Sequence, residues 1–572
     1  MLDCVIRGGT VIDGTGAPGR LADVAIKDGK IVRIGTVTEE AAQVIDATGK
    51  LVTPGFIDVH THYDAQAFWD TTLSPSPLHG ITTVIAGNCG FTIAPLVPEH
   101  GDYMMRMLAR VEGMPLQSLQ QGVPWGEWSS FGQFLDRLDG TLSVNAGFMV
   151  GHSAIRRQVM AERSIGNLAT DDELEAMKNL LRESIAAGGM GFSSTWATTH
   201  NDPWGNPVPS RHASEDEMVA LSSVAGEFDG TSLEFIPAVG RFKPDVIDLV
   251  ARMSAGANRP LNWNLIAPST SPQQMAVMEN NLGASDYAKA HGGKVLALTV
   301  PCPIESRLSF ETGFVLDALP GWAEPMTAPI PERMAQLADP NRRRELDELA
   351  QGPSPMRGVA KWHKLTVGEV FTEENQQYLG RTIAEIAEDE GKTTFDALCD
   401  IVLTDDLRTG LRQPTRGDDD DTWELRVKVW RDERTLLGGS DAGAHLDLLA
   451  TFNSTSAMLG KAVRERNLLS WEEAVHHISD VPAQTYGMKL RGRLAEGYHA
   501  DVCVIDPTRV GAKPTVTRTD LPGGAWRLYG EAECIDHVLV NGEEIVRRGE
   551  FTANRPGTIL RSGRDTADTG IH

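Results

Sequence analysis

Residues Gly55 to His62, which read GFIDVHTH, decide how the rest of this chain is interpreted. A short apolar run with a β-branched residue is typical of a strand, and it leads directly into His60 and His62. Residues i and i+2 of a strand point to the same side, so the two imidazoles are expected to project into one space. Two converging neutral imidazoles form half of a divalent-metal site, suited to zinc or a similar ion.

A second segment, Leu436 to His445 (LLGGSDAGAH), supplies a carboxylate far downstream. Asp441 follows what reads as a late strand, and in a (β/α) barrel the chemistry lies at the carboxyl ends of the strands. There Asp441 is predicted to bind the metal and to accept a proton from a metal-activated water. Taken alone, Ser-Asp-Ala-Gly is more typical of a turn or a helix cap, so this prediction depends on the histidine pair.

Length and composition favour an ordinary globular enzyme. The chain has 572 residues, 41% of them hydrophobic and 23% charged, which is long enough for a large barrel with additions. The net charge of −25 argues against nucleic acid or an anionic membrane as a partner. A signal-peptide pattern and a long apolar span are not apparent, so no membrane association is expected. Six scattered cysteines suggest reduced thiols and a cytoplasmic location.

The pattern along the chain predicts an α/β fold: a (β/α)8 TIM-like barrel with a small β-sandwich domain built from both chain termini. Short strands with Asp-Gly and Asn-Gly turns occupy both ends, while strand-like and helical runs alternate between them. Residues 171–186 are the clearest predicted helix. The expected division is residues 1–53 and 485–560 for the sandwich, 54–484 for the barrel, and 561–572 for a tail. Insertions near 101–140 and 305–365 are expected over the barrel mouth.

Four stretches together resemble the amidohydrolase superfamily and, within it, the N-acyl-D-amino-acid deacylase (D-aminoacylase) family. They are residues 54–62 (PGFIDVHTH), 87–91 (GNCGF), 438–445 (GGSDAGAH) and 492–501 (GRLAEGYHAD). The resemblance implies metal-dependent hydrolysis of an amide bond, with one or two divalent ions, zinc above all. It also implies that His60, His62 and Cys89 are metal ligands and that Asp441 is both a ligand and the general base.

The chain departs from this family pattern in the middle strands. The family has two further metal-binding histidines about thirty residues apart, where this chain has Glu234 and Asn264. Glu234 either replaces one imidazole as a metal ligand or is a hydrogen-bonding core residue, and both interpretations remain open. Asn264 is a candidate for substrate binding, as is His152, which follows a strand where the family has a similar Gly-His-Gly.

The carboxylate clamp of the family is also missing. Its His-Pro-Arg after the catalytic aspartate is absent, and so is its Asp-x-Tyr-Pro-Tyr element. Without that arginine fork an N-acyl amino acid loses its usual anchor, although Arg156 and Arg211 are candidates for a substitute. The resemblance therefore predicts the type of reaction better than it predicts the substrate.

The sequence thus predicts a hydrolase of C–N amide bonds that is similar to the N-acyl-D-amino-acid deacylases and uses a metal-activated water. The expected partner is a small-molecule amide, and a homo-oligomer is compatible with the sequence. The alternative is an amidohydrolase acting on neutral, cyclic or bulky hydrophobic amides or esters. A third interpretation is an inactive scaffold that has lost its metal, and the intact His60, His62 and Asp441 argue against it.

Overall fold

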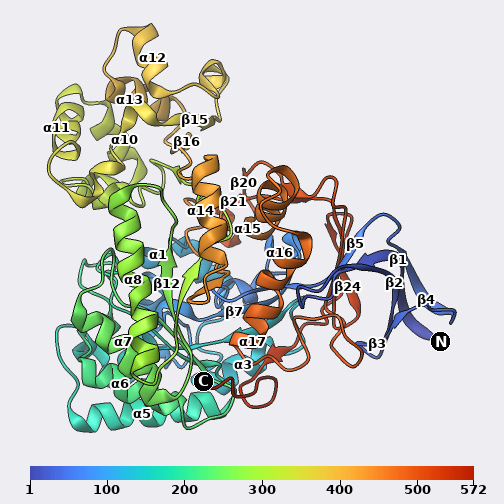
Figure 1. The fold of residues 1–572 in the computed structure, drawn as a ribbon. Helices are drawn as coiled ribbons and strands as arrows, with labels where there is room; N and C mark the ends of the chain where they lie inside the picture. Colours follow the sequence, from blue (N-terminus) through green and yellow to red (C-terminus); the bar gives the residue numbers. More distant parts are fainter. Residues whose placement is uncertain (572) are drawn as a thin grey trace.

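The protein is described over residues 1–571 by a computed structural model, and it is an α/β fold (Figure 1). The parallel strands form two hydrogen-bonded runs. Within each run, successive strands pair in the order of the chain. The first run is β6 (Phe56–Asp58), β7 (Ile81–Ala86) and β8 (Asn145–Phe148), with β26 (Ile559–Leu560) beside β8. The second run is β9 (Val150–Gly151), β10 (Gly191–Thr195), β11 (Ser232–Ile236), β12 (Leu261–Ile266), β13 (Val295–Thr299) and β17 (Thr435–Leu437).

The first and last of these parallel strands meet at their carboxyl ends. Thr61, after β6, forms a parallel bridge with Ala442, after β17. The backbone N–H of Asp441 donates to the carbonyl of His60 at 3.0 Å. This contact brings together the two segments that the sequence singled out.

Helices occupy the connections between the parallel strands and the segment that follows β17. They include α4 (His152–Met160), α5 (Asp171–Ala186), α6 (Glu215–Ala225), α7 (Pro244–Ala257), α8 (Pro272–Ala290), α14 (Asp420–Trp430), α16 (Trp471–Ile478) and α17 (Asp480–Thr485). Helix α5 has the predicted bounds, because Thr170 and Glu173 form a capping box at its start and Met177, Leu181 and Ile185 bury one face. No helix within residues 1–571 is both long and apolar enough to cross a membrane.

The two ends of the chain share one nine-stranded sheet. From the N-terminal side come β1 (Leu2–Val11), β2 (Arg20–Lys27), β3 (Lys30–Gly35), β4 (Ala41–Asp46) and β5 (Leu51–Pro54). From the C-terminal side come β18 (Val502–Ile505), β23 (Ile535–Val540), β24 (Glu543–Arg547) and β25 (Glu550–Phe551). The two halves join where β5 pairs antiparallel with β18, with Val52 opposite Val504.

The first insertion contains three helices: α1 (Gly101–Val111), α2 (Leu116–Gly122) and α3 (Phe131–Leu138). The second extends beyond the expected 305–365. Its own core runs from Leu308 to Leu411, because β14 (Arg307–Leu308) and β15 (Thr366–Glu369) both pair with β16 (Gly410–Arg412). Four of its helices, α10 (Ile330–Ala338), α11 (Pro340–Ala350), α12 (Ile383–Glu390) and α13 (Thr394–Thr404), stand apart at the top of Figure 1.

Candidate active site

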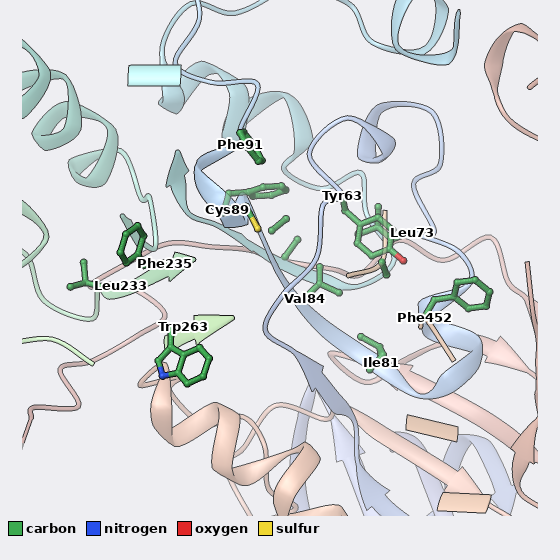
Figure 2. Close-up of a cluster of buried hydrophobic side chains, with 14 of the residues drawn as sticks. Tyr63, Leu73, Ile81, Val84, Cys89, Phe91, Leu233, Phe235, Trp263 and Phe452 are labelled. Carbon is green, nitrogen blue, oxygen red and sulfur yellow. The ribbon is translucent and has the colours of Figure 1, made fainter. Parts of the chain in front are cut away.

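The site is built at strand ends by the simple alternation of strand residues. In β11, Leu233 and Phe235 lie in the outer apolar core, and Glu234 between them points to the opposite side. In β12, Trp263 likewise lies in the apolar core, and Asn264 points to the opposite side. Figure 2 shows Leu233, Phe235 and Trp263 among the apolar side chains of this core, together with Cys89. The polar residues are thereby left to face the interior.

Asp58, at the end of β6, fixes the two segments that carry the site. Its Oδ1 accepts the backbone N–H of His60 at 3.3 Å and that of Ser440 at 3.1 Å. Burial raises the pKa of Asp58, and these donors act against that rise. The histidine segment and the aspartate segment are therefore held in register by one buried carboxyl group.

Cys89 reaches the site from a tight loop after β7. It has a left-handed backbone, with φ of 57°, between Gly87 and Gly90. A side chain at Gly87 would collide with the carbonyl of Met149 at 2.6 Å, so glycine is required there. Burial raises the pKa of the Cys89 thiol well above its usual value, and a bound cation would favour the thiolate.

Three donor atoms, from His60, His62 and Cys89, lie within 4.8 Å of one another, and Oδ1 of Asp441 lies beside the two imidazoles. The sulfur lies 3.5 Å from His60 Nε2 and 3.9 Å from His62 Nε2. Asp441 Oδ1 lies 3.6 Å from His60 Nε2 and 3.1 Å from His62 Nε2. Zinc–ligand bonds of about 2.0–2.3 Å in a tetrahedron place neighbouring donors about 3.3–3.6 Å apart. The three donors His60, His62 and Cys89 therefore fit a divalent metal, and Asp441 lies next to them.

The two histidines differ in charge state. Burial lowers the pKa of His60 to about 3, so this imidazole is neutral. Burial also acts to lower the pKa of His62, but Glu112 and Asp441 outweigh it and raise that pKa to about 9. A positive charge is thus favoured beside His62, and either a proton or a divalent cation can supply it.

Glu234 lies against the other face of His60. Its Oε2 accepts the backbone N–H of Cys89 at 2.7 Å, its Oε1 accepts from the Asn264 amide, and Oε1 lies 4.0 Å from His60 Nδ1. Burial raises the pKa of Glu234 to about 8. The structure thus brings Glu234 and Asn264 to the site, behind the first set of donors and in contact with each other.

His152 and Arg156 are placed elsewhere. Both are fully buried, and both bind Glu217: His152 through Nε2 at 2.8 Å, and Arg156 through Nη1, which donates to both carboxylate oxygens. His152 also contacts Ser194 Oγ at 2.9 Å. Neither residue lines the site cavity, because this network holds both side chains beneath the Cys89 loop. The structure does not bring His152 or Arg156 to the cavity beside the donors, where the sequence had placed them as candidates for substrate binding.

Glu112 is a site residue that sequence reasoning missed. It ends α1 in the first insertion, is only 2% exposed, and places Oε1 3.4 Å from His62 Nδ1. No motif surrounds it, and a glutamate at the end of a surface-type helix carries no local signal of burial. Only its tertiary position reveals it.

A cavity of about 120 Å³ opens beside the donors. Apart from the donors and Glu112, its polar lining includes His200, Asn264 and His445. Its apolar lining is Ile236, Leu265, Leu298, Val300, Ile304 and Leu449. No lysine or arginine lines it in the part of the chain that the structure describes.

The chain is similar to proteins of known activity along its whole length. Residues 43–341 and 363–546 match the model of the Amidohydrolase family. N-acyl-D-glutamate deacylase of Alcaligenes xylosoxydans xylosoxydans is 28% identical over 100% of this chain and 98% of its own. D-aminoacylase of the same organism is 26% identical over 98% of this chain and 97% of its own. N-acyl-D-glutamate deacylase of Bordetella bronchiseptica, solved with zinc and a phosphonate mimic of the tetrahedral intermediate, has a TM-score of 0.64 at 25% identity, covering 98% of this chain and 100% of that one.

Proposed function

This chain belongs to the amidohydrolase family and is a hydrolase of carbon–nitrogen bonds other than peptide bonds, and on that premise we propose that it deacylates N-acyl-D-amino acids. The observation that carries the proposal is the convergence of donor atoms of His60, His62 and Cys89, with the Asp441 carboxylate beside the two imidazoles. The alternative of neutral, cyclic or ester substrates is not favoured, because the similar enzymes of known activity are deacylases of N-acyl-D-amino acids. An inactive scaffold is opposed by the complete donor set.

We propose zinc as the ion, since two imidazoles, a thiolate and a carboxylate form a borderline-soft donor set. When bound, the ion lowers the pKa of a water molecule and polarises the carbonyl of the amide. Glu234 fits an orienting role, because it faces Nδ1 of His60 and already accepts two hydrogen bonds. It remains a candidate ligand if a second ion binds.

Asp441 is proposed as the group that moves the proton. Burial alone would raise its pKa, but the hydrogen bond and charge of His62 hold that pKa well below its usual value. The carboxylate is therefore ionised and able to accept a proton from the attacking water. It then returns the proton to the departing nitrogen. The oxygens of Asp441 lie 3.1–3.7 Å from nitrogens of His60, His62 and His445, which stabilise the charge of the carboxylate.

We also propose how the strands are arranged into domains. Strand succession and the Thr61–Ala442 bridge support a closed (β/α)8 barrel, and the shared terminal sheet supports a β-sandwich made of residues 1–53 and 485–560. Asn264 is proposed to contact the substrate, since it lines the cavity. A small amide as partner, a cytoplasmic location and self-association remain predictions of the sequence.

Counting metal ions per chain tests the proposed function. After chelation and re-addition of zinc, elemental analysis should find at least one ion in the parent protein. His60→Ala with His62→Ala should abolish both metal retention and hydrolysis while far-ultraviolet circular dichroism stays unchanged. His476→Ala with His477→Ala is the matched control, because this adjacent pair lies in α16 outside the cavity. A parent protein that binds no metal, or a double variant that binds it stoichiometrically, would refute the proposal.

A further inference from the structure

Glu112 is the one carboxylate at the site that comes from an insertion. Its backbone N–H caps α1 by donating to Leu108 at 2.9 Å, and its carbonyl accepts the backbone N–H of His445 at 2.5 Å. The next residue, Gly113, packs against His445, where an added Cβ would lie 3.2 Å from its Cα. The end of α1 is thus attached to the loop that carries Asp441.

The side chain of Glu112 points the other way, to His62. Its Oε1 is buried, has no hydrogen-bond partner among the described residues, and lies 3.4 Å from His62 Nδ1. The opposite ring nitrogen, Nε2, faces Cys89 and Asp441. A buried acceptor without a donor is costly, and an N–H on Nδ1 of His62 is the donor that this geometry offers.

We propose that Glu112 is a positioning residue that keeps the proton of His62 on Nδ1 and so leaves Nε2 free to bind the metal. The proposal rests on the proposed function, since it assigns to His62 the role of a metal ligand. A histidine that binds metal with one nitrogen commonly donates the other N–H to a carboxylate, and losing that partner weakens metal binding about 10–100-fold. Glu112 would then make metal binding depend on the first insertion.

Two substitutions of similar size separate positioning from packing. Glu112→Gln keeps a side-chain carbonyl that accepts from Nδ1–H, whereas Glu112→Met fills the same space without an acceptor. The measurement is the dissociation constant for zinc alone, obtained by competition with a chromophoric chelator. Glu112→Met should bind zinc about 10–100-fold more weakly than the parent, and Glu112→Gln should recover most of that loss. Glu99→Met, at an exposed position before α1, is the control and should not change the constant.

Equal zinc affinity in the Gln and Met variants would overturn the inference, because the acceptor would then have no role. The parent protein is the arm that tests the proposed function. If it binds no zinc, the metal site itself is refuted; if it binds zinc and both variants match it, only the role of Glu112 is refuted. Cobalt substitution adds a second readout, since loss of the Nδ1 acceptor should alter the visible absorption of the bound ion in Glu112→Met but not in Glu112→Gln.

Discussion

The contacts of Asp441 with its histidine neighbours suit it to the two roles proposed for it, metal binding and proton transfer. The same Oδ1 lies 3.1 Å from His62 and 3.6 Å from His60, and Oδ2 lies 3.7 Å from His445. One oxygen is thus directed to the donor cluster while the other faces the cavity side. Because one oxygen stays with the donors, the other oxygen can accept and release a proton while the side chain keeps its place.

Asp441→Asn should lower kcat by about 10²–10⁴-fold, because an amide retains the oxygen but cannot accept the proton. Zinc content measured by elemental analysis should remain near that of the parent, which separates proton transfer from metal retention. Asp420→Asn, at an exposed position in α14, is the control. Activity of Asp441→Asn within about tenfold of the parent would exclude Asp441 as the general base.

Which site residues could be predicted depended on whether their signal was local. His60 and His62 stand two apart after a strand, so their convergence follows from strand geometry alone. Glu112 lacks such a pattern because its burial is created by a loop over three hundred positions later, around His445. His152 also follows a strand, but the sequence could not show that Glu217 would bind it away from the cavity.

Among the elements, those with regular periodicity were predictable. Helix α5 has both a capping box and a buried stripe, so its bounds could be read directly. The second insertion could not be delimited, because its end is set by the pairing of β16 with β14 and β15 across a long stretch of chain. Short strands of this kind carry little pattern of their own.

Glu544 in β24 makes the stability of the terminal sheet depend on pH. Burial acts to raise the pKa of Glu544, but hydrogen bonds from His537 at 2.5 Å, from Arg547 and from Gln43 lower it to about 2. A lowered folded-state pKa stabilises the protein above the ordinary value of 4.5, and that contribution is lost as pH falls through about 2. Glu544 therefore links β4, β23 and β24 most strongly near neutral pH.

Glu544→Gln should lower the free energy of unfolding at pH 7, and its difference from the parent should shrink as pH falls from about 5 towards 2. Urea denaturation at a series of pH values measures this difference. Glu543→Gln, the exposed neighbour on the same strand, should show little difference at any pH. A difference for Glu544→Gln that is constant across the range would contradict the assignment.

At the scale of the whole molecule, the segments packed around the cavity determine what can bind in it. Arg110 in α1 forms an ion pair with Asp317 of the second insertion at 2.5 Å, and Phe314 stacks on His445 with ring centroids 5.3 Å apart. The segments around α1 and around Phe314 therefore contact each other, and the second also packs on His445 of the cavity lining. Of these two segments only the first contributes to the cavity lining, through Glu112, and among the described residues no arginine or lysine lines the cavity.

The enzyme should consequently discriminate weakly for the free carboxylate of its substrate. We expect kcat/KM for N-acetyl-D-amino acids to exceed that for their carboxamides by less than about tenfold, since no cationic fork faces the cavity. The measurement is a paired panel, with the N-acetyl-L-amino acids as the stereochemical control. A preference for the acids of about 100-fold, worth about 2.7 kcal/mol, would reveal an anchor such as Arg211 that moves into the site.

The pairing of β5 with β18 has a consequence for synthesis on the ribosome. β1 to β5 emerge first, yet the strand that completes their sheet is made only after the entire catalytic region between them. At 5–20 residues per second this delay is on the order of tens of seconds. During that time β5 presents an unpaired edge, which is a hazard for association with other nascent chains. The joint between β5 and β18 therefore cannot form until residues 502–505 have been translated, and the edge of β5 has to be protected until then.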